Sequence, residues 1–193
     1  MSDDSRTPEF SRPVEIGKIP PGGLRETISA DAGELKALAA RMKIPAINSL
    51  SAELRLEPWK KGRVRVRGNF TAEVEQQCVR TLDIFTTTMD EPVERIYVRP
   101  QYANAAELRA HRADPFTDPD APDVADVAVD DVIDLGELVA ESLALALDPW
   151  PRKPGTDFVD YSTGGGEGPD GDGEEGENGK SPFAALGKLR SGR

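Results

Sequence analysis

Apolar and polar residues alternate strictly through the middle of the chain. Along residues 63–78, even positions are mostly apolar and odd positions are polar, and Leu54 and Leu56 keep the same phase before a turn at Pro58–Gly62. A period of two predicts a strand with one buried face, as in an antiparallel sheet with one side in water. The phase is unchanged across Gly68, which predicts a bend there rather than a bulge.

Shorter strands are predicted on both sides of this segment. Glycine and proline clusters and turn residues separate them. Asp90-Glu91-Pro92 is expected to form a turn between the last two. The expected strands are Phe10–Ile19, Leu24–Ile28, Leu82–Thr88 and Val93–Arg99, and a short helix is expected at Ala105–Arg112.

Two segments have helical periodicity, and each opens with Asp followed three residues later by Glu. Asp31 and Glu34 open the first, and Asp134 and Glu137 open the second, in the form of a capping box. A proline ends each helix. The apolar faces comprise Leu35, Leu38, Ala39 and Met42 in the first helix, and Leu135, Leu138, Val139, Leu143, Ala146 and Leu147, with polar Ser142, in the second.

These elements predict an α+β fold. We expect a meander-like antiparallel sheet of about five to seven strands, with the two amphipathic helices packed on its apolar face. Residues 10–155 would form this domain, after a disordered start at 1–9. Residues 156–180 are rich in Gly, Asp and Glu and predict a disordered linker. Residues 181–193 become apolar again and resemble a short docking motif.

Composition narrows the function classes. The chain has 193 residues, of which 37% are apolar. No apolar run is long enough to span a bilayer, and the polar start is not a secretory signal. One Cys and one His exclude a disulfide framework and a multi-ligand Cys/His zinc site within this sequence.

No catalytic or metal-binding pattern emerges from the residues. Cys78 falls on the apolar face of the long strand and is expected to be a buried thiol; nothing supports a Cys78–His111 pair. The acids at 114–134 lack EF-hand spacing and predict a solvated loop, and the glycines at 164–168 follow no strand, so they do not form a phosphate-binding loop. We therefore expect no cofactor, no metal and no enzymatic activity.

Charge is segregated along the chain. The net charge is -11, yet residues 113–148 hold eleven acids and no base, whereas Arg55–Arg67 holds six bases and one acid. Alternate residues on a strand share a face about 6.6 Å apart, so Arg63, Arg65 and Arg67 would form a ridge. The candidate contacts to RNA phosphates are Lys60, Lys61, Arg63, Arg65 and Arg67.

Two interpretations of this ridge stay open at the level of sequence. The guanidiniums bind a polyanion, by phosphate and shape contacts rather than by base reading. Alternatively, they pair across strands with Glu53, Glu57 or Glu94. The polar face is expected to carry no aromatic side chain for base stacking.

Three motifs in order resemble the YceD family, also called domain of unknown function 177. The first is Cys78-Val-Arg80-Thr-Leu82 with Asp90-Glu91-Pro92 after it; the second is the helix that begins at Asp134-Leu135-Gly136-Glu137; the third is Ser181-Pro182-Phe183-Ala-Ala-Leu. The start at Arg12-Pro13 resembles alphaproteobacterial members. Thr81 stands where the family has a second cysteine, which removes a two-cysteine metal or redox site from this chain.

The resemblance implies a cytoplasmic, non-enzymatic protein needed for 23S ribosomal RNA accumulation and large-subunit assembly. The expected partners are ribosomal RNA or a pre-50S particle, and a basic large-subunit ribosomal protein, without a membrane. The alternative function is an acidic adaptor or chaperone that binds such a protein through residues 113–134 and the tail, with no RNA contact. An RNA-modifying enzyme is a third class, disfavoured by the lack of a cofactor fingerprint.

Overall fold

A computed structural model describes residues 8–111 and 125–155. These residues belong to one compact unit, Met1–Thr156. The expected disordered start at 1–9 falls almost wholly outside the described residues, as do the linker at 156–180 and the motif at 181–193. Within the described ranges, every helix is too short or too polar to cross a bilayer.

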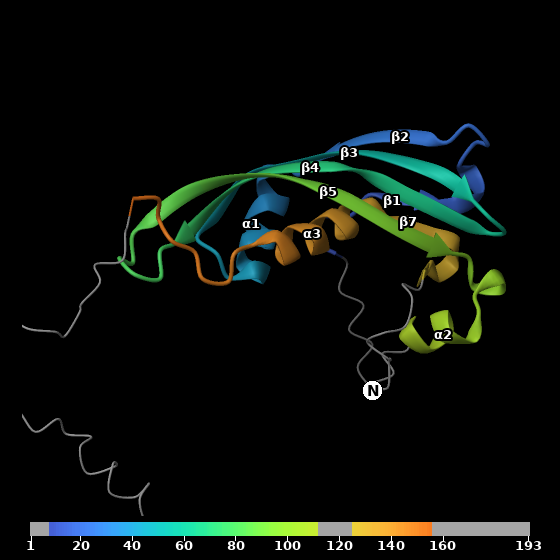
Figure 1. Ribbon diagram of the computed structural model, residues 1–193. Helices are drawn as coiled ribbons and strands as arrows, with labels where there is room; N and C mark the ends of the chain where they lie inside the picture. Colours follow the sequence, from blue (N-terminus) through green and yellow to red (C-terminus); the bar gives the residue numbers. More distant parts are fainter. Residues whose placement is uncertain (1–7, 112–124, 156–193) are drawn as a thin grey trace, which may run out of the picture. The chain divides into compact units, whose positions relative to one another are not determined.

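The centre of the fold is a five-stranded sheet with the order β2-β3-β4-β5-β6 (Figure 1). The first four strands form an antiparallel meander, and the last is a two-residue strand parallel to β5. The strands are β2 (Leu24–Ser29), β3 (Ala46–Trp59), β4 (Arg63–Gln77), β5 (Ile84–Val98) and β6 (Asp126–Val127). The predicted α+β class and the meander are confirmed.

The apolar face of the sheet is covered by α1 (Ala32–Met42), α3 (Leu135–Ala146) and a small second sheet. In that second sheet β1 (Pro13–Glu15) pairs antiparallel with β7 (Val132–Asp134). A short helix, α2 (Ala105–His111), follows β5, and the single-turn 3₁₀ helices are η1 (Ile16–Lys18), η2 (Pro100–Tyr102) and η3 (Val129–Asp131). The largest fully buried side chains include Phe10, Phe70, Leu38, Leu56, Leu138 and Leu143, so residues from both ends of the described chain share one core.

Both predicted helix starts are confirmed, but they differ in detail. Asp31 accepts the N–H groups of Gly33 and Glu34, and Glu34 accepts the N–H of Asp31, which completes a capping box. Asp134 caps α3 in the same way. The Glu137 carboxylate instead binds Arg41 of α1, with a shortest N–O distance of 2.6 Å. This pair joins the two helices under the sheet.

Gly68 lies where the backbones of β3 and β4 approach each other closely. Leu54, Gly68 and Val93 stand in register across three strands with no shift, so the prediction that this position has no bulge is confirmed. A Cβ atom here would lie 1.9 Å from the carbonyl oxygen of Glu53. Only glycine fits this approach. The register shift lies instead between Ile47 and Ser49 in β3.

The predicted turn at Asp90–Pro92 is wrong. A single strand, β5, runs through these residues, and Pro92 stands opposite Asn69 of β4. Proline lacks a backbone N–H, so it interrupts a strand only where a neighbouring strand needs that N–H as a hydrogen-bond donor. Strand β6 pairs only with Tyr97 and Val98, so no second strand among the described residues requires a donor from Pro92.

The predicted first strand is also too long. Within Phe10–Ile19 only Pro13–Glu15 is extended and paired, because β7 offers three partner residues. The chain then turns through η1. Phe10 is nonetheless fully buried, and Arg12 pairs with Glu34 at 2.8 Å, so the segment is anchored without being a long strand.

Candidate nucleic-acid interface

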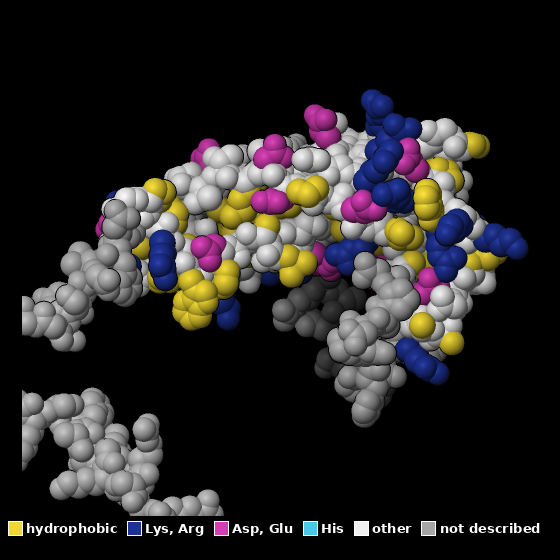
Figure 2. All heavy atoms as spheres, in the orientation of Figure 1, with side chains coloured by type: hydrophobic (Ala, Val, Ile, Leu, Met, Phe, Trp, Pro, Cys, Tyr) yellow, Lys and Arg dark blue, Asp and Glu magenta, His cyan; other side chains and the backbone are white. Residues whose placement is uncertain are grey.

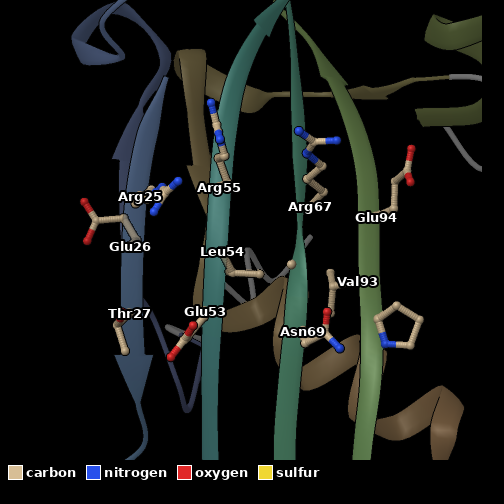
Figure 3. Close-up of a pocket in the computed structure, with 12 residues that line it drawn as sticks. Arg25, Glu26, Thr27, Glu53, Leu54, Arg55, Arg67, Asn69, Val93 and Glu94 are labelled. Atoms are coloured by element: carbon tan, nitrogen blue, oxygen red, sulfur yellow. The ribbon is translucent and has the colours of Figure 1, made fainter. Parts of the chain in front are cut away.

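Three arginines form one row across the outer, polar face of the sheet. Arg25 on β2 stands opposite Arg55 on β3, and Arg55 stands opposite Arg67 on β4 (Figure 3). They line an open hollow of about 590 Å³ together with polar residues that include Glu53, Asn69 and Glu94. Like charges directly opposite each other destabilise a sheet unless an anion compensates them.

Each arginine of the predicted ridge already has a carboxylate partner. Arg63 binds Glu107 at 2.7 Å and Arg65 binds Glu94 at 2.6 Å. Glu57 is shared, by Arg67 at 3.1 Å and by Arg55 at 2.8 Å. Cross-strand pairing with Glu57 and Glu94 is therefore present, and binding of a polyanion by the same arginines stays a prediction.

Glu107 is the partner that the sequence did not reveal. Its side chain is 4% exposed and lies on α2, which contacts β6. Burial opposes its ionisation, but hydrogen bonds from the Asn104 N–H and from Arg63 outweigh burial and hold the pKa of Glu107 below its ordinary value. Arg63 therefore serves in the folded protein as the ion-pair partner of the buried Glu107.

A positive surplus remains at this end of the sheet. Arg25, Lys60 and Lys61 have no ion pair with any described residue, and Arg55 and Arg67 share one carboxylate. Figure 2 shows Lys and Arg side chains gathered toward the end where β3 turns into β4, and mostly acidic side chains farther along. Lys60 and Lys61 are exposed, as a phosphate contact requires.

Trp59 gives this face an aromatic side chain that the sequence analysis did not expect. It is the last residue of β3 rather than part of the turn, and its odd number places it on the polar face. Its ring is 39% exposed and lies 5.4 Å from the Arg65 guanidinium and 6.0 Å from Lys60 Nζ. Strand parity would have identified it had the strand been extended by two residues, from Glu57 to Trp59.

The turn between β3 and β4, next to Trp59, depends on Gly62. Its φ is +65°, and a Cβ atom would lie 2.0 Å from the Tyr102 ring. The Gly62 carbonyl also accepts the Arg99 N–H at 3.0 Å. This turn, with Lys60 and Lys61 on it, is therefore held against the chain that follows β5.

The first family motif forms the turn between β4 and β5, at the opposite end of the sheet. Cys78 is fully buried, as predicted. The N–H of Lys153, the hydroxyl and N–H of Thr81 and the N–H of Arg80 donate to its sulfur and lower the pKa of Cys78 to about 6. Leu82 has φ +62° and is 66% exposed, and Arg80 is also exposed.

The second motif is structural. Asp134 caps α3, Leu135 is fully buried, and Glu137 binds Arg41. A Cβ atom on Gly136 would lie 2.4 Å from the Phe10 carbonyl oxygen, so this glycine lets the N-terminal segment cross the helix. Pro182 and Phe183 of the third motif lie outside the described residues.

Only part of the expected acidic loop is described. Asp126 binds Arg95 at 3.1 Å and Asp131 binds Arg99, so these two acids form ion pairs while staying partly exposed to solvent. Residues 112–124 lie outside the described ranges. Across residues 8–111 and 125–155, no three His, Cys, Asp or Glu side chains gather as a metal site.

The fold and the polar outer face of its sheet identify the class of protein. It is an α+β protein in which one side of a long meander faces solvent and helices cover the other side. Residues 66–190 match the family described as Large ribosomal RNA subunit accumulation protein YceD. The chain belongs to this family, whose name gives it a role in accumulation of the large ribosomal RNA. No curated protein and no solved structure gives a significant match.

Proposed function

We propose that this protein is a cytoplasmic, non-enzymatic factor for 23S ribosomal RNA accumulation and large-subunit biogenesis that contacts the RNA, or a pre-50S particle, directly. The supporting observation is the positive surplus that remains after every ion pair on the outer face has been assigned. The contact set is Arg25, Arg55, Trp59, Lys60, Lys61 and Arg67. Arg63 is excluded from it because Glu107 holds its guanidinium.

The arrangement suits a phosphate backbone. Arg25, Arg55 and Arg67 lie on adjacent strands about 4.8 Å apart, and guanidinium groups bind phosphate through two parallel hydrogen bonds. A phosphate would also relieve the repulsion within the row, which Glu57 relieves only in part. Trp59 offers a ring for an unpaired base.

The test is binding of a 23S ribosomal RNA fragment to wild type and to the variant R25Q/R55Q/K60Q/K61Q across salt concentrations. Each phosphate contact contributes about 0.7–0.9 to the slope of log K against log salt, so losing four lowers the slope by about 3. The matched control is K36Q/K43Q, two exposed lysines at α1. An unchanged slope in the fourfold variant contradicts RNA contact at this face.

The alternative function is an adaptor for a basic ribosomal protein through residues 113–134 and the tail. Most of that segment lies outside the described residues. Partners that survive nuclease treatment in a pull-down, together with no RNA binding by the purified protein, would favour the adaptor.

A further inference from the structure

Strand β5 has a long free edge. It pairs with β4 along its whole length, but β6 pairs only with Tyr97 and Val98 on the other side. Within residues 8–111 and 125–155, the segment 84–96 therefore has a strand neighbour on one side only, and Figure 1 shows β5 at the border of the sheet. An unpaired edge presents a row of N–H and C=O groups that can pair with another chain.

The backbone groups that point to this edge follow from one hydrogen bond. The Ala128 N–H donates to the Val98 carbonyl at 2.9 Å, so Val98 points its backbone groups away from β4. Alternate residues point the same way along a strand. Thr86 and Thr88 therefore offer their N–H and C=O groups to the free edge, and Pro92 has the same orientation.

The two halves of this edge differ in protection. Charged side chains and proline are the usual devices that discourage strand pairing, and residues 90–95 carry Asp90, Glu91, Pro92, Glu94 and Arg95. Residues 84–89 are Ile-Phe-Thr-Thr-Thr-Met, with no charge and no proline. Such β-branched and aromatic residues favour strand pairing, so this half is open to a further strand.

The side chains on the two faces of the sheet next to residues 84–89 indicate which kind of polypeptide segment would bind there. On the outer face Thr86 and Thr88 stand opposite Glu75 and Glu73 of β4. Neither glutamate has an ion pair with a described residue, although Asn48 donates to Glu73 at 3.0 Å. On the inner face Phe85, Thr87 and Met89 are partly buried.

We infer that residues 84–89 of β5 accept, as an added strand, an extended polypeptide segment of a partner protein that alternates basic and apolar residues. Its apolar side chains would cover Phe85 and Met89. Its Lys or Arg side chains would lie over the short threonines and reach Glu73 and Glu75, two strands or about 10 Å away. Main-chain hydrogen bonds supply affinity and alternate side chains supply specificity in this mode of recognition.

The probe is a blocked seven-residue peptide of alternating Lys and Val, titrated into the full chain by isothermal calorimetry. We expect T88P to weaken binding at least tenfold, because it removes an N–H at the free edge. Thr88 does not use this N–H to bond β4, and Pro92 shows that proline fits at this orientation. We expect E73Q/E75Q to weaken binding severalfold and to reduce its salt dependence; the control E26Q, on the other edge strand, leaves both unchanged.

A second peptide keeps the proposal testable even if T88P does not fold. It has the same sequence with an N-methyl group on every residue, which keeps the charge but removes every N–H that could pair with a strand. Weak binding of this peptide supports the added strand. Equal binding of both peptides, equal binding to wild type and folded T88P, or no binding up to about 1 mM overturns it. Loss of RNA binding in T88P with unchanged peptide binding also overturns it and assigns the edge to RNA.

Discussion

Arg63 on β4 donates to Glu107 on α2 across 2.7 Å, and the Glu107 side chain is almost fully buried. The pair joins residues 44 positions apart. It ties the helix after β5 onto the sheet and occupies one nitrogen of the Arg63 guanidinium.

Removal of Arg63 should cost more stability than neutralisation of Glu107. Arg63→Ala leaves a buried carboxylate without its charged partner, which costs about 2–3 kcal/mol of unfolding free energy. Glu107→Gln keeps one of the two acceptor oxygens and leaves no buried charge, since the Arg63 side chain is still 23% exposed, so it should cost less. Urea unfolding of both variants measures the difference, and equal losses would contradict the assigned burial of Glu107.

The same pair predicts how stability depends on pH. The pKa of Glu107 is lowered in the folded state, so its stabilising contribution is full above the unfolded carboxyl pKa of about 4.3 and declines as pH falls below it. The stability advantage of wild type over Glu107→Gln should therefore narrow below about pH 4.3. Unfolding free energies of both proteins between pH 3 and pH 7 test this, and a constant difference would exclude the shift.

Gly68→Ala should destabilise the protein by about 1–3 kcal/mol, because its Cβ would overlap the Glu53 carbonyl of a neighbouring strand. Gly17→Ala is the control, since nothing lies within 4 Å of its Cβ. Thermal unfolding should show a lower Tm for the first variant alone. A neutral Gly68→Ala would mean that β3 and β4 do not approach this closely.

The Cys78 thiol should ionise at a much lower pH than an ordinary thiol. Donors from Lys153, Thr81 and Arg80 place its pKa at about 6 against an ordinary 9.0. Its contribution to stability should therefore rise as pH increases between these values and be absent below them. The thiolate absorbance near 240 nm should titrate with a midpoint near pH 6 and vanish in Cys78→Ser.

The variant Thr81→Val separates the hydroxyl from the rest of this environment. It removes one donor to the Cys78 sulfur without changing the size of the side chain, so the midpoint should move upward. An unchanged midpoint would mean that the hydroxyl does not reach the sulfur.

The sequence correctly predicted the elements that are marked by a pattern among neighbouring residues. The alternation along residues 63–78 predicted β4 and its polar face, and Asp31 and Asp134 predicted the starts of α1 and α3. The turn predicted at Asp90–Pro92 is wrong, because the effect of a proline depends on whether a neighbouring strand needs an N–H at that position. That neighbour is fixed by the sheet order, which the sequence does not state.

The sequence by itself determined which side chains share a face, because a strand repeats every two residues whatever surrounds it. It thus determined that Arg63, Arg65 and Arg67 point to solvent together, and the match to YceD rests on the sequence as well. Only the tertiary structure decided which basic side chains on this face have a carboxylate partner and which remain available to bind an anion. Glu107 arrives from a helix far along the chain and Arg25 from a neighbouring strand, and Coulomb interactions depend on distance in space rather than along the chain.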